Sequence, residues 1–321
     1  MSLKVIEQGV HTTIQDLGRY GYRSLGFPVN GPMDDYAMQL ANFLVGNEAS
    51  EAVLEMSVIG PTIECMTDTV IAITGADMSA NINEQLIPYG KAVAVSAGDV
   101  IQLRTAKTGI YGYLAIKGGI NVESLLGSKS TIVRADHDHL LTRPLQNGDE
   151  IPIRSAIVST GQQPSYINPE VFDYITTSYP VIHYMEGAQY EWFDEKTKQL
   201  FEQIDWQISS QSNRMGYRIN GGRLHYPQDK QLLTEATSFG AIQVPPSGEP
   251  IVLMADGQPT GGYPKIGQIA QVDLPKLSQL RPGQPFQLKK CTLNDAMEWL
   301  YERDRFLTMM QKLTNQLWKE V

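Results

Sequence analysis

The residues best suited to chemistry form a run in the last third of the sequence, where Gly261, Gly262, Tyr263, Pro264 and Lys265 follow one another. Paired glycines permit a backbone approach that side chains would block, and the proline fixes the chain directly before the lysine. A lysine held in this way beside apolar strands loses part of its hydration. We therefore expect a lowered pKa for the Lys265 amine and a role as acid, base or oxyanion partner.

Four arginines carry a second kind of chemistry. Arg214 and Arg218 bracket a Gly-Tyr pair in the segment RMGYR, and Arg19 and Arg23 bracket the same pair in RYGYR. A guanidinium is a planar fork suited to a carboxylate or a phosphate. The alternative role is structural, with each arginine paired to a nearby aspartate and stacked on the tyrosine. The sequence leaves both roles open for Arg19 and Arg23.

Other catalytic motifs are absent or incomplete. The run GSKST at 127–131 resembles half of a phosphate loop but lacks the full GxxxxGK[ST] spacing, and neither GxGxxG nor GxSxG is present. His137 and His139 lie on one side of an extended segment and could chelate a metal ion. Because the spacing suggests no third ligand, we expect no metal site.

Composition narrows the class of protein. The 321 residues carry a net charge of −9, with 42% hydrophobic and 19% charged residues, as is typical of a globular protein. A negative surface repels phosphate backbones, so we expect no nucleic-acid partner. The sequence has no run of roughly 18 apolar residues for a membrane helix, no signal sequence and no cysteine framework. We therefore expect a cytoplasmic protein with no membrane partner.

The RxGYR pattern belongs to a longer internal repeat. Three further pairs of segments follow in the same order, each pair separated by roughly half of the chain; they are 54–63 with 234–243, 70–77 with 251–258, and 97–103 with 282–288. A repeat of this length is too long for a solenoid unit. The sequence therefore predicts two related domains, residues 1–160 and 161–321, joined within the polar stretch 159–170.

The local pattern predicts a mostly-β chain. Short segments rich in valine and isoleucine are separated by Gly, Pro, Asn and Asp, as in barrels and sandwiches. Helices are few: we expect one over 33–47 with Asp34 as its N-cap, and a second over 189–204. A third begins at Thr292 or Asn294, and its apolar stripe would pack on the chain's own barrel or on a partner. The residues of that stripe are Ala296, Leu300, Leu307, Met310, Leu313 and Leu317.

Several long motifs resemble the biotin-dependent carboxyltransferase-like family. They are TTIQDLGRYGYRSLGFPVNGPMDDYAMQLANFLVGN (12–47), ITGAD (73–77), YLAIKGG (113–119), LGSKST (126–131), SNRMGYR (212–218) and GAIQVPPSGEPIVLMADGQPTGGYPKIG (240–267). The resemblance runs from about residue 5 to about residue 290. One departure is the segment HDHLLTRPL (137–145), where the family usually has a glycine-rich turn.

The resemblance implies a tandem of two cyclophilin-like β-barrels with a few helices and a C-terminal helix. The family includes the C subunit of the bacterial ATP-dependent 5-oxoprolinase, also called allophanate hydrolase subunit 2, which opens 5-oxo-L-proline (pyroglutamate) to L-glutamate together with the A and B subunits of that enzyme. In the related urea carboxylase, the equivalent domain transfers a carboxyl group from biotin to urea. A third kind of member antagonises a sporulation-kinase inhibitor, and these three functions stay open as alternatives.

The resemblance also implies the cofactors and the site. No cofactor would be tightly bound, the complex would use ATP, and any biotin would arrive on another chain, because this sequence lacks a Met-Lys-Met biotin-accepting hairpin. Lys265 and Arg214 would be the catalytic pair that stabilises negative charge on a small amide substrate, with Lys265 also donating a proton. The expected substrate-binding residues shape the pocket or line its rim and the interface with the B subunit; they are Gly261, Gly262, Tyr263, Arg218, Gln243, Gln15, Asp16 and Arg19.

Overall fold

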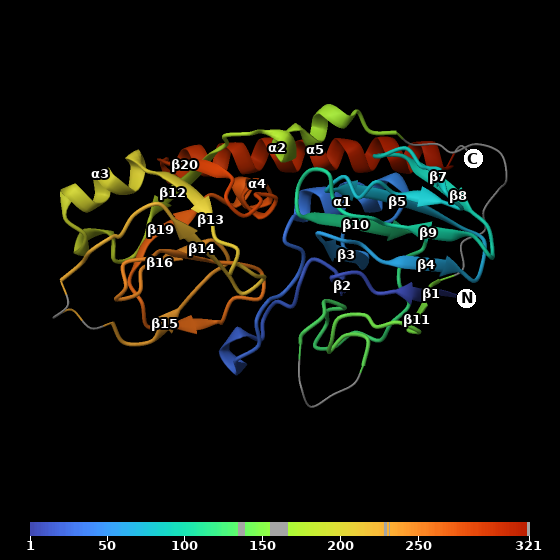
Figure 1. Ribbon diagram of the computed structural model, residues 1–321, viewed down its shortest axis with the longest axis horizontal. Coiled ribbons are helices and arrows are strands. Elements are labelled where there is room, and N and C mark those ends of the chain that lie inside the picture. The colour runs from blue at the N-terminus through green and yellow to red at the C-terminus, as the bar shows by residue number, and fades with distance from the viewer. Residues whose placement is uncertain (134–138, 155–165, 228–229, 231, 320–321) are drawn as a thin grey trace. The chain divides into compact units, whose positions relative to one another are not determined.

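The structure is a computed structural model that describes residues 1–133, 139–154, 166–227, 230 and 232–319. The chain forms two compact units (Figure 1). Unit 1 contains Met1–Arg19, Asn30–Thr176 and Asp304–Val321, and unit 2 contains Tyr20–Val29 and Thr177–Arg303. Each unit is therefore built from separate stretches of the sequence. The boundary expected between residues 160 and 161 lies outside the described residues.

Unit 1 contains two antiparallel sheets (Figure 1). The six-stranded sheet runs in the order β11 (Glu150–Pro152), β1 (Ser2–Glu7), β4 (Thr62–Cys65), β9 (Val100–Gln102), β6 (Asn81–Ile82) and β7 (Gln85–Leu86). The five-stranded sheet runs in the order β2 (His11–Gln15), β3 (Val53–Ser57), β10 (Tyr111–Ile116), β5 (Thr69–Gly75) and β8 (Ala92–Val95). Side chains from both sheets, among them Leu3, Ile63, Leu54 and Leu114, meet in one buried apolar core.

Helix α1 (Asp35–Leu44) covers the other face of the five-stranded sheet. Strand β10 is buried along its whole length, because the core lies on one of its sides and α1 on the other. Asp34 caps α1 by accepting a hydrogen bond from Ala37 N at 2.9 Å, which confirms the predicted cap. Thr74 of β5 donates to Ala37 O at 2.7 Å and ties the helix to the sheet.

Unit 2 is a closed seven-stranded barrel (Figure 1). Its order is β12 (Val181–Glu186), β19 (Lys265–Ile269), β16 (Ala241–Gln243), β17 (Ile251–Leu253), β14 (Gly216–Asn220), β13 (Asp205–Ile208) and β20 (Pro285–Lys290). Parallel pairing of β20 with β12 closes the ring. A separate two-stranded ribbon pairs β15 (Glu235–Ala236) with β18 (Thr260–Gly261).

The remaining helices before the C-terminal one are short. They are α2 (Asp173–Thr176) in unit 1, and α3 (Glu195–Gln203) and α4 (Leu274–Ser278) in unit 2. The helix expected over 189–204 is divided into a 3₁₀ turn, Tyr190–Trp192, and α3. The division falls at Asp194, whose carboxylate accepts from Thr197 N at 2.7 Å and starts α3 afresh.

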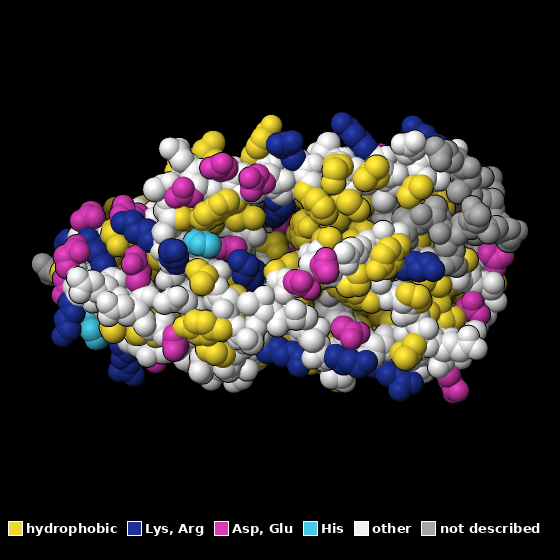
Figure 2. Space-filling view, turned by 90° about the horizontal axis from the view of Figure 1, so that it is seen from above, with side chains coloured by type: hydrophobic (Ala, Val, Ile, Leu, Met, Phe, Trp, Pro, Cys, Tyr) yellow, Lys and Arg dark blue, Asp and Glu magenta, His cyan; other side chains and the backbone are white. Residues whose placement is uncertain are grey.

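Helix α5 (Leu293–Lys319) begins directly after Thr292, as expected. Ala296 and Leu307 are buried on it, whereas Leu313 and Leu317 are 50% and 41% exposed in the single chain. Packing of the stripe on the chain's own units therefore holds for only part of it, and a partner contact for the rest stays a prediction. On the face that carries α5, hydrophobic side chains gather over unit 1 (Figure 2).

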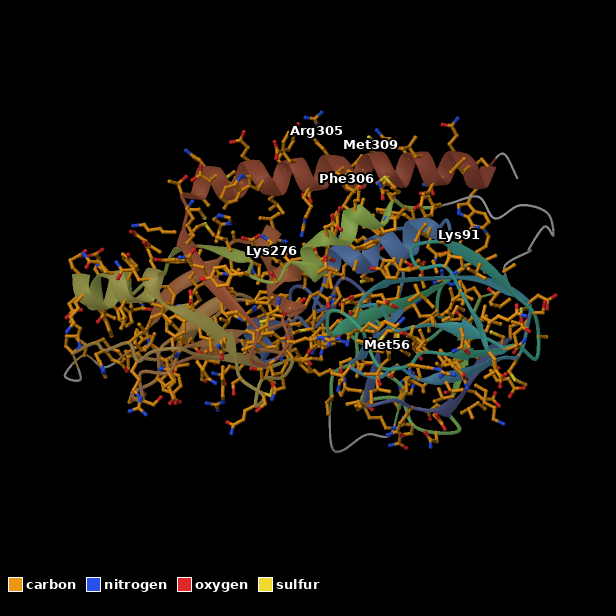
Figure 3. The ribbon with its side chains drawn as sticks, turned by 45° about the horizontal axis from the view of Figure 1, so that its top comes forward. Met56, Lys91, Lys276, Arg305, Phe306 and Met309 are labelled. Carbon is orange, nitrogen blue, oxygen red and sulfur yellow. The ribbon has the colours of Figure 1, made fainter. Side chains whose placement is uncertain are left out.

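Aromatic side chains hold the last part of α5 on unit 1. Phe306 points from α5 toward α1 (Figure 3), and its ring centre lies 6.2 Å from that of Tyr36. Trp318 Nε1 donates to Leu44 O at 3.1 Å, and Lys117 Nζ lies 3.1 Å from the centre of the indole ring. Burial lowers the pKa of Lys117 to about 8.

The predicted class of fold is confirmed: the chain is mostly β, with a barrel and a C-terminal helix. The repeated segments, however, do not take equivalent places in the sheets. In unit 1, β4 pairs with β9, whereas the segments aligned with them form β16 and β20, which are not neighbours in the barrel. The order of the motifs is kept while the strand partners differ, because pairing depends on long-range packing that short motifs do not encode. In the described parts of the chain, no helix is both long and apolar enough to span a membrane.

Candidate functional site

Lys265 lies at the start of strand β19 and is 9% exposed. The strand pairs with β16, where Gln243 stands opposite Lys265 next to an irregularity in the register. Directly paired residues of antiparallel strands project to the same face of a sheet. The ammonium of Lys265 and the amide of Gln243 therefore share one face of the barrel wall.

The ammonium group of Lys265 is held by a carboxylate. Lys265 Nζ donates to Glu235 Oε1, and it also reaches Ala236 O at 3.3 Å. The hydrogen bond from Lys265 holds the pKa of Glu235 below its usual range, and a second bond from Gln189 acts in the same direction. The lysine is thus buried as half of an ion pair, and not as an isolated amine.

Gln189 ties the Glu235 carboxylate to the backbone of Lys265. Its side-chain Oε1 accepts from Lys265 N at 3.0 Å, and its Nε2 donates to Glu235 Oε1 at 2.9 Å. Its backbone N donates to Lys265 O at 3.2 Å. Because one side chain contacts both the Lys265 backbone and the Glu235 carboxylate, the two charged groups keep a defined geometry.

The β15–β18 ribbon lies over the Gln243 amide. Gly261 of β18 pairs with Glu235 of β15, and a Cβ on Gly261 would lie 2.5 Å from Gln243 Nε2. The close approach expected at this glycine is therefore made by the chain's own glutamine. Gly262 is exposed, and a Cβ there would make ordinary contacts at 3.7 Å and beyond. Tyr263 is 42% exposed.

Gln243 carries an unsatisfied donor. The residue is 2% exposed, and within the described residues its Nε2 has no hydrogen-bond partner. A buried amide donor that makes no hydrogen bond costs about 1–3 kcal/mol of stability. An orphaned donor of this kind beside a lysine–glutamate pair marks the face as a candidate site for a ligand with acceptor oxygens.

Arginines from both RxGYR copies hold the loop that leads into β18. Arg214 makes a two-pronged ion pair with Asp256, Nε to Oδ2 at 2.8 Å and Nη2 to Oδ1 at 2.9 Å. Arg23 donates to the carbonyl oxygens of Thr237 and Pro259. These contacts fix the loop at Asp256 and at Pro259. One arginine of each RxGYR copy therefore has a structural role. Lys265 and Arg214 themselves lie in separate ion pairs.

Arg218, on β14, has an exposed side chain. Three expected rim residues, Gln15, Asp16 and Arg19, belong to unit 1. Gln15 is 1% exposed and donates to Thr13 Oγ1 at 3.0 Å.

Asp16 and Arg19 hold the GSKST loop of unit 1 (residues 127–131) by hydrogen bonds. The Asp16 carboxylate accepts hydrogen bonds from Ser128 Oγ at 2.5 Å, Lys129 N at 2.6 Å and Ser130 Oγ at 2.6 Å. Arg19 donates to Leu125 O at 3.0 Å and to Ser130 O at 2.9 Å. The donors that suggested a phosphate loop are thus directed at an aspartate of the same chain.

Sequence reasoning missed Glu235, Gln189 and Asp256. Glu235 lies in the internal repeat, five residues before a glycine, but nothing in the sequence indicates that it pairs with Lys265. Gln189 lies 76 residues from Lys265 and has no local signal at all. His137 lies outside the described residues, and within those that are described no group of His, Cys, Asp and Glu is arranged to hold a metal ion.

The arrangement is suited to binding a polar carbonyl compound. It offers a cationic donor, an anionic acceptor and a neutral amide donor on one face of the barrel. A preorganised ammonium stabilises negative charge on a carbonyl oxygen without reorganisation of solvent.

The comparisons with known proteins identify the family of the chain. Residues 25–290 match the family model described as carboxyltransferase domain, subdomain A and B. The chain therefore belongs to the carboxyltransferase domain family.

Two bacterial relatives align with almost the whole chain. The sequence is 36% identical over 312 residues to the 5-oxoprolinase C subunit of Escherichia coli (strain K12), covering 96% of this chain and 97% of that protein. It is 31% identical over 314 residues to the 5-oxoprolinase C subunit of Haemophilus influenzae, covering 98% and 99%. The crystal structure of the Kluyveromyces lactis urea carboxylase matches 96% of this chain with a TM-score of 0.88 and 28% identity. This chain spans only 29% of that protein.

Proposed function

We propose that this chain is the C subunit of an ATP-dependent 5-oxoprolinase, which opens 5-oxo-L-proline to L-glutamate together with A and B subunits. The observation that carries the proposal is the overlap with two proteins named as the C subunit of 5-oxoprolinase over 97% and 99% of their lengths. The buried ion pair of Lys265 gives this assignment a chemical basis.

Ring opening breaks the C–N bond of the lactam, adds a hydroxyl group to the carbonyl carbon and a proton to the nitrogen. Negative charge builds on the carbonyl oxygen while the carbon is attacked. The Lys265 ammonium, held by Glu235, stabilises that oxygen and can return a proton to the nitrogen. Arg214 acts as a positioning residue, because its fork holds the loop at Asp256.

A biotin-dependent carboxylase acting on urea is the second candidate, favoured by the likeness to the urea carboxylase structure. Both reactions place negative charge on the oxygen of a small planar amide, so the same lysine serves either. Because this chain matches less than a third of the urea carboxylase, biotin and the remaining steps would have to come from other chains.

The test is reconstitution of this chain with the A and B subunits encoded in the same genome. We expect ATP-dependent release of glutamate from 5-oxo-L-proline that disappears when this chain is left out. Avidin-sensitive carboxylation of urea would instead favour the second candidate. Neither activity from any combination would overturn the enzymatic proposal and leave a regulatory binding role.

A further inference from the structure

The Lys265–Glu235 pair presents a hydrogen-bond donor and an acceptor side by side. A lysine ammonium has three N–H donors, of which two are directed at Glu235 Oε1 and Ala236 O. Among the described residues, no acceptor meets the third. Glu235 uses Oε1 for Lys265 and for Gln189, and its Oε2 has no donor in the described parts of the chain. One N–H of Lys265 and one carboxylate oxygen of Glu235 are therefore available to a ligand.

The solvent can reach this edge of the pair. The Glu235 side chain is 37% exposed, whereas the Lys265 side chain is 11% exposed. The carboxylate is thus the open side, and the ammonium lies deeper. A ligand that approaches from solvent therefore meets the Glu235 carboxylate first and the ammonium behind it.

We propose that this pair recognises the edge of a cis-amide, in which the C=O and the N–H point in the same direction. The carbonyl oxygen accepts from Lys265 Nζ, and the amide N–H donates to Glu235 Oε2. A lactam has this edge because its ring holds the amide cis, and urea has it as well. An open-chain trans amide directs its C=O and N–H to opposite sides and satisfies only one of the two groups. The inference rests on the proposed function and names the substrate class of its site.

Two features of the surrounding structure support a built site. Gln189 contacts both the Lys265 backbone and the Glu235 carboxylate, so the carboxylate is held beside the start of β19 before any ligand arrives. Gln243, on the same face of the sheet, is a buried amide whose Nε2 lacks a partner within the described residues. Buried donors are nearly always satisfied, so an acceptor from outside the chain is the expected partner on this face.

The test compares 5-oxo-L-proline with its N-methyl derivative, which keeps the carbonyl but lacks the N–H. Dissociation constants are measured by titration calorimetry with the full chain and with the complex reconstituted with the A and B subunits. We expect the unmethylated lactam to bind about tenfold more tightly, the usual effect of one hydrogen bond to a charged group. In Glu235→Ala the preference falls to about twofold or less.

Two further variants control for folding and for size. Glu249→Ala removes an exposed glutamate that lies 3.8 Å from Arg223, and it should keep the full preference. Glu235→Gln keeps the size of the side chain and offers a neutral acceptor, so its preference should be intermediate. Circular dichroism establishes that each variant is folded.

The outcomes separate this inference from the proposed function. A full preference in folded Glu235→Ala, equal binding of both ligands by the wild type, or no binding of either ligand to the chain or the complex would each overturn the cis-amide site. If glutamate release persists in those cases, the 5-oxoprolinase assignment stands without it. If the preference depends on Glu235 but no combination releases glutamate, the site stands and the assignment fails.

Discussion

Replacement of Gly261 by alanine should loosen the ribbon that covers the site, whereas the same change at the neighbouring Gly262 should not. The added Cβ at Gly261 would lie 2.5 Å from Gln243 Nε2 and 3.2 Å from Thr237 Cγ2, both closer than atoms normally pack. At Gly262 the nearest atoms lie at 3.7 and 3.9 Å, which is ordinary van der Waals contact. The two adjacent glycines therefore form a matched pair of test and control.

The size of the effect follows from how little room Gln243 has. Its amide is the flexible end of a side chain, which lowers the cost, but the residue is only 2% exposed and cannot swing into solvent. Overpacking of this kind costs about 1–2 kcal/mol of unfolding free energy. The Gly262→Ala variant should stay within about 0.5 kcal/mol of the wild type.

The assay is urea denaturation of the full chain, followed by fluorescence. Shortening the glutamine removes the clash, so adding Gly261→Ala to a Gln243→Ser background should cost much less than it does in the wild type. Binding of 5-oxo-L-proline should also weaken in Gly261→Ala, because Gly261 pairs with Glu235 across the ribbon. Equal stability of the two alanine variants would refute the packing argument.

Two further predictions concern charged groups outside the lysine pair. Arg214→Lys keeps the charge but loses the two-pronged contact to Asp256, so the free energy of unfolding should fall by about 1–2 kcal/mol; if thermal denaturation finds it no less stable than the wild type, the clamp is not structural. The pKa of Lys117 is about 8 in the folded chain against an ordinary 10.5, so the unfolded chain binds more protons between these values and stability should rise with pH across that window. Denaturation at about pH 7.5 and about pH 10 should show this rise in the wild type and lose it in Lys117→Met; an equal rise in both would assign the effect to other groups.

The sequence predicts well those features that depend on neighbouring residues. Asp34 is identifiable as the cap of α1 because an N-cap lies next to the helix that it starts. The Gly-Gly-Tyr-Pro run directly before Lys265 singles out that lysine, which is buried in the structure. The local sequence pattern also predicts a mostly-β chain with a C-terminal helix, as the structure has it.

The sequence could not supply the long-range partners. Glu235 lies 30 residues from Lys265, and nothing in either segment shows which of the 35 acidic residues reaches the lysine. Asp16 is a charged residue among glycines, which suggested the rim of a pocket. Its partners Ser128 and Ser130 lie more than a hundred residues away in the sequence and could not be inferred from it. In α5, Leu313 continues an apolar pattern, but the helix turns Thr314 inward instead. Contacts set by the packing of distant strands carry no signal in a single sequence.

The roles expected for the predicted catalytic and substrate-binding residues stay predictions. Lys265, Gly261 and Gln243 are brought together in unit 2, where Arg214 holds the neighbouring loop. Their involvement in catalysis depends on whether the lysine ammonium meets the substrate oxygen.

The most direct measurement of that claim is the kcat for glutamate release by the reconstituted complex, with Lys265→Met in place of the wild type. Lys289→Met is the matched control, since Lys289 is an exposed lysine on β20. At saturating 5-oxo-L-proline and ATP, loss of a charge-stabilising donor should lower kcat by about a hundredfold or more while the complex stays intact. The control should stay within about twofold, as expected for a surface substitution. A Lys265→Met complex that works at the wild-type rate would contradict the account.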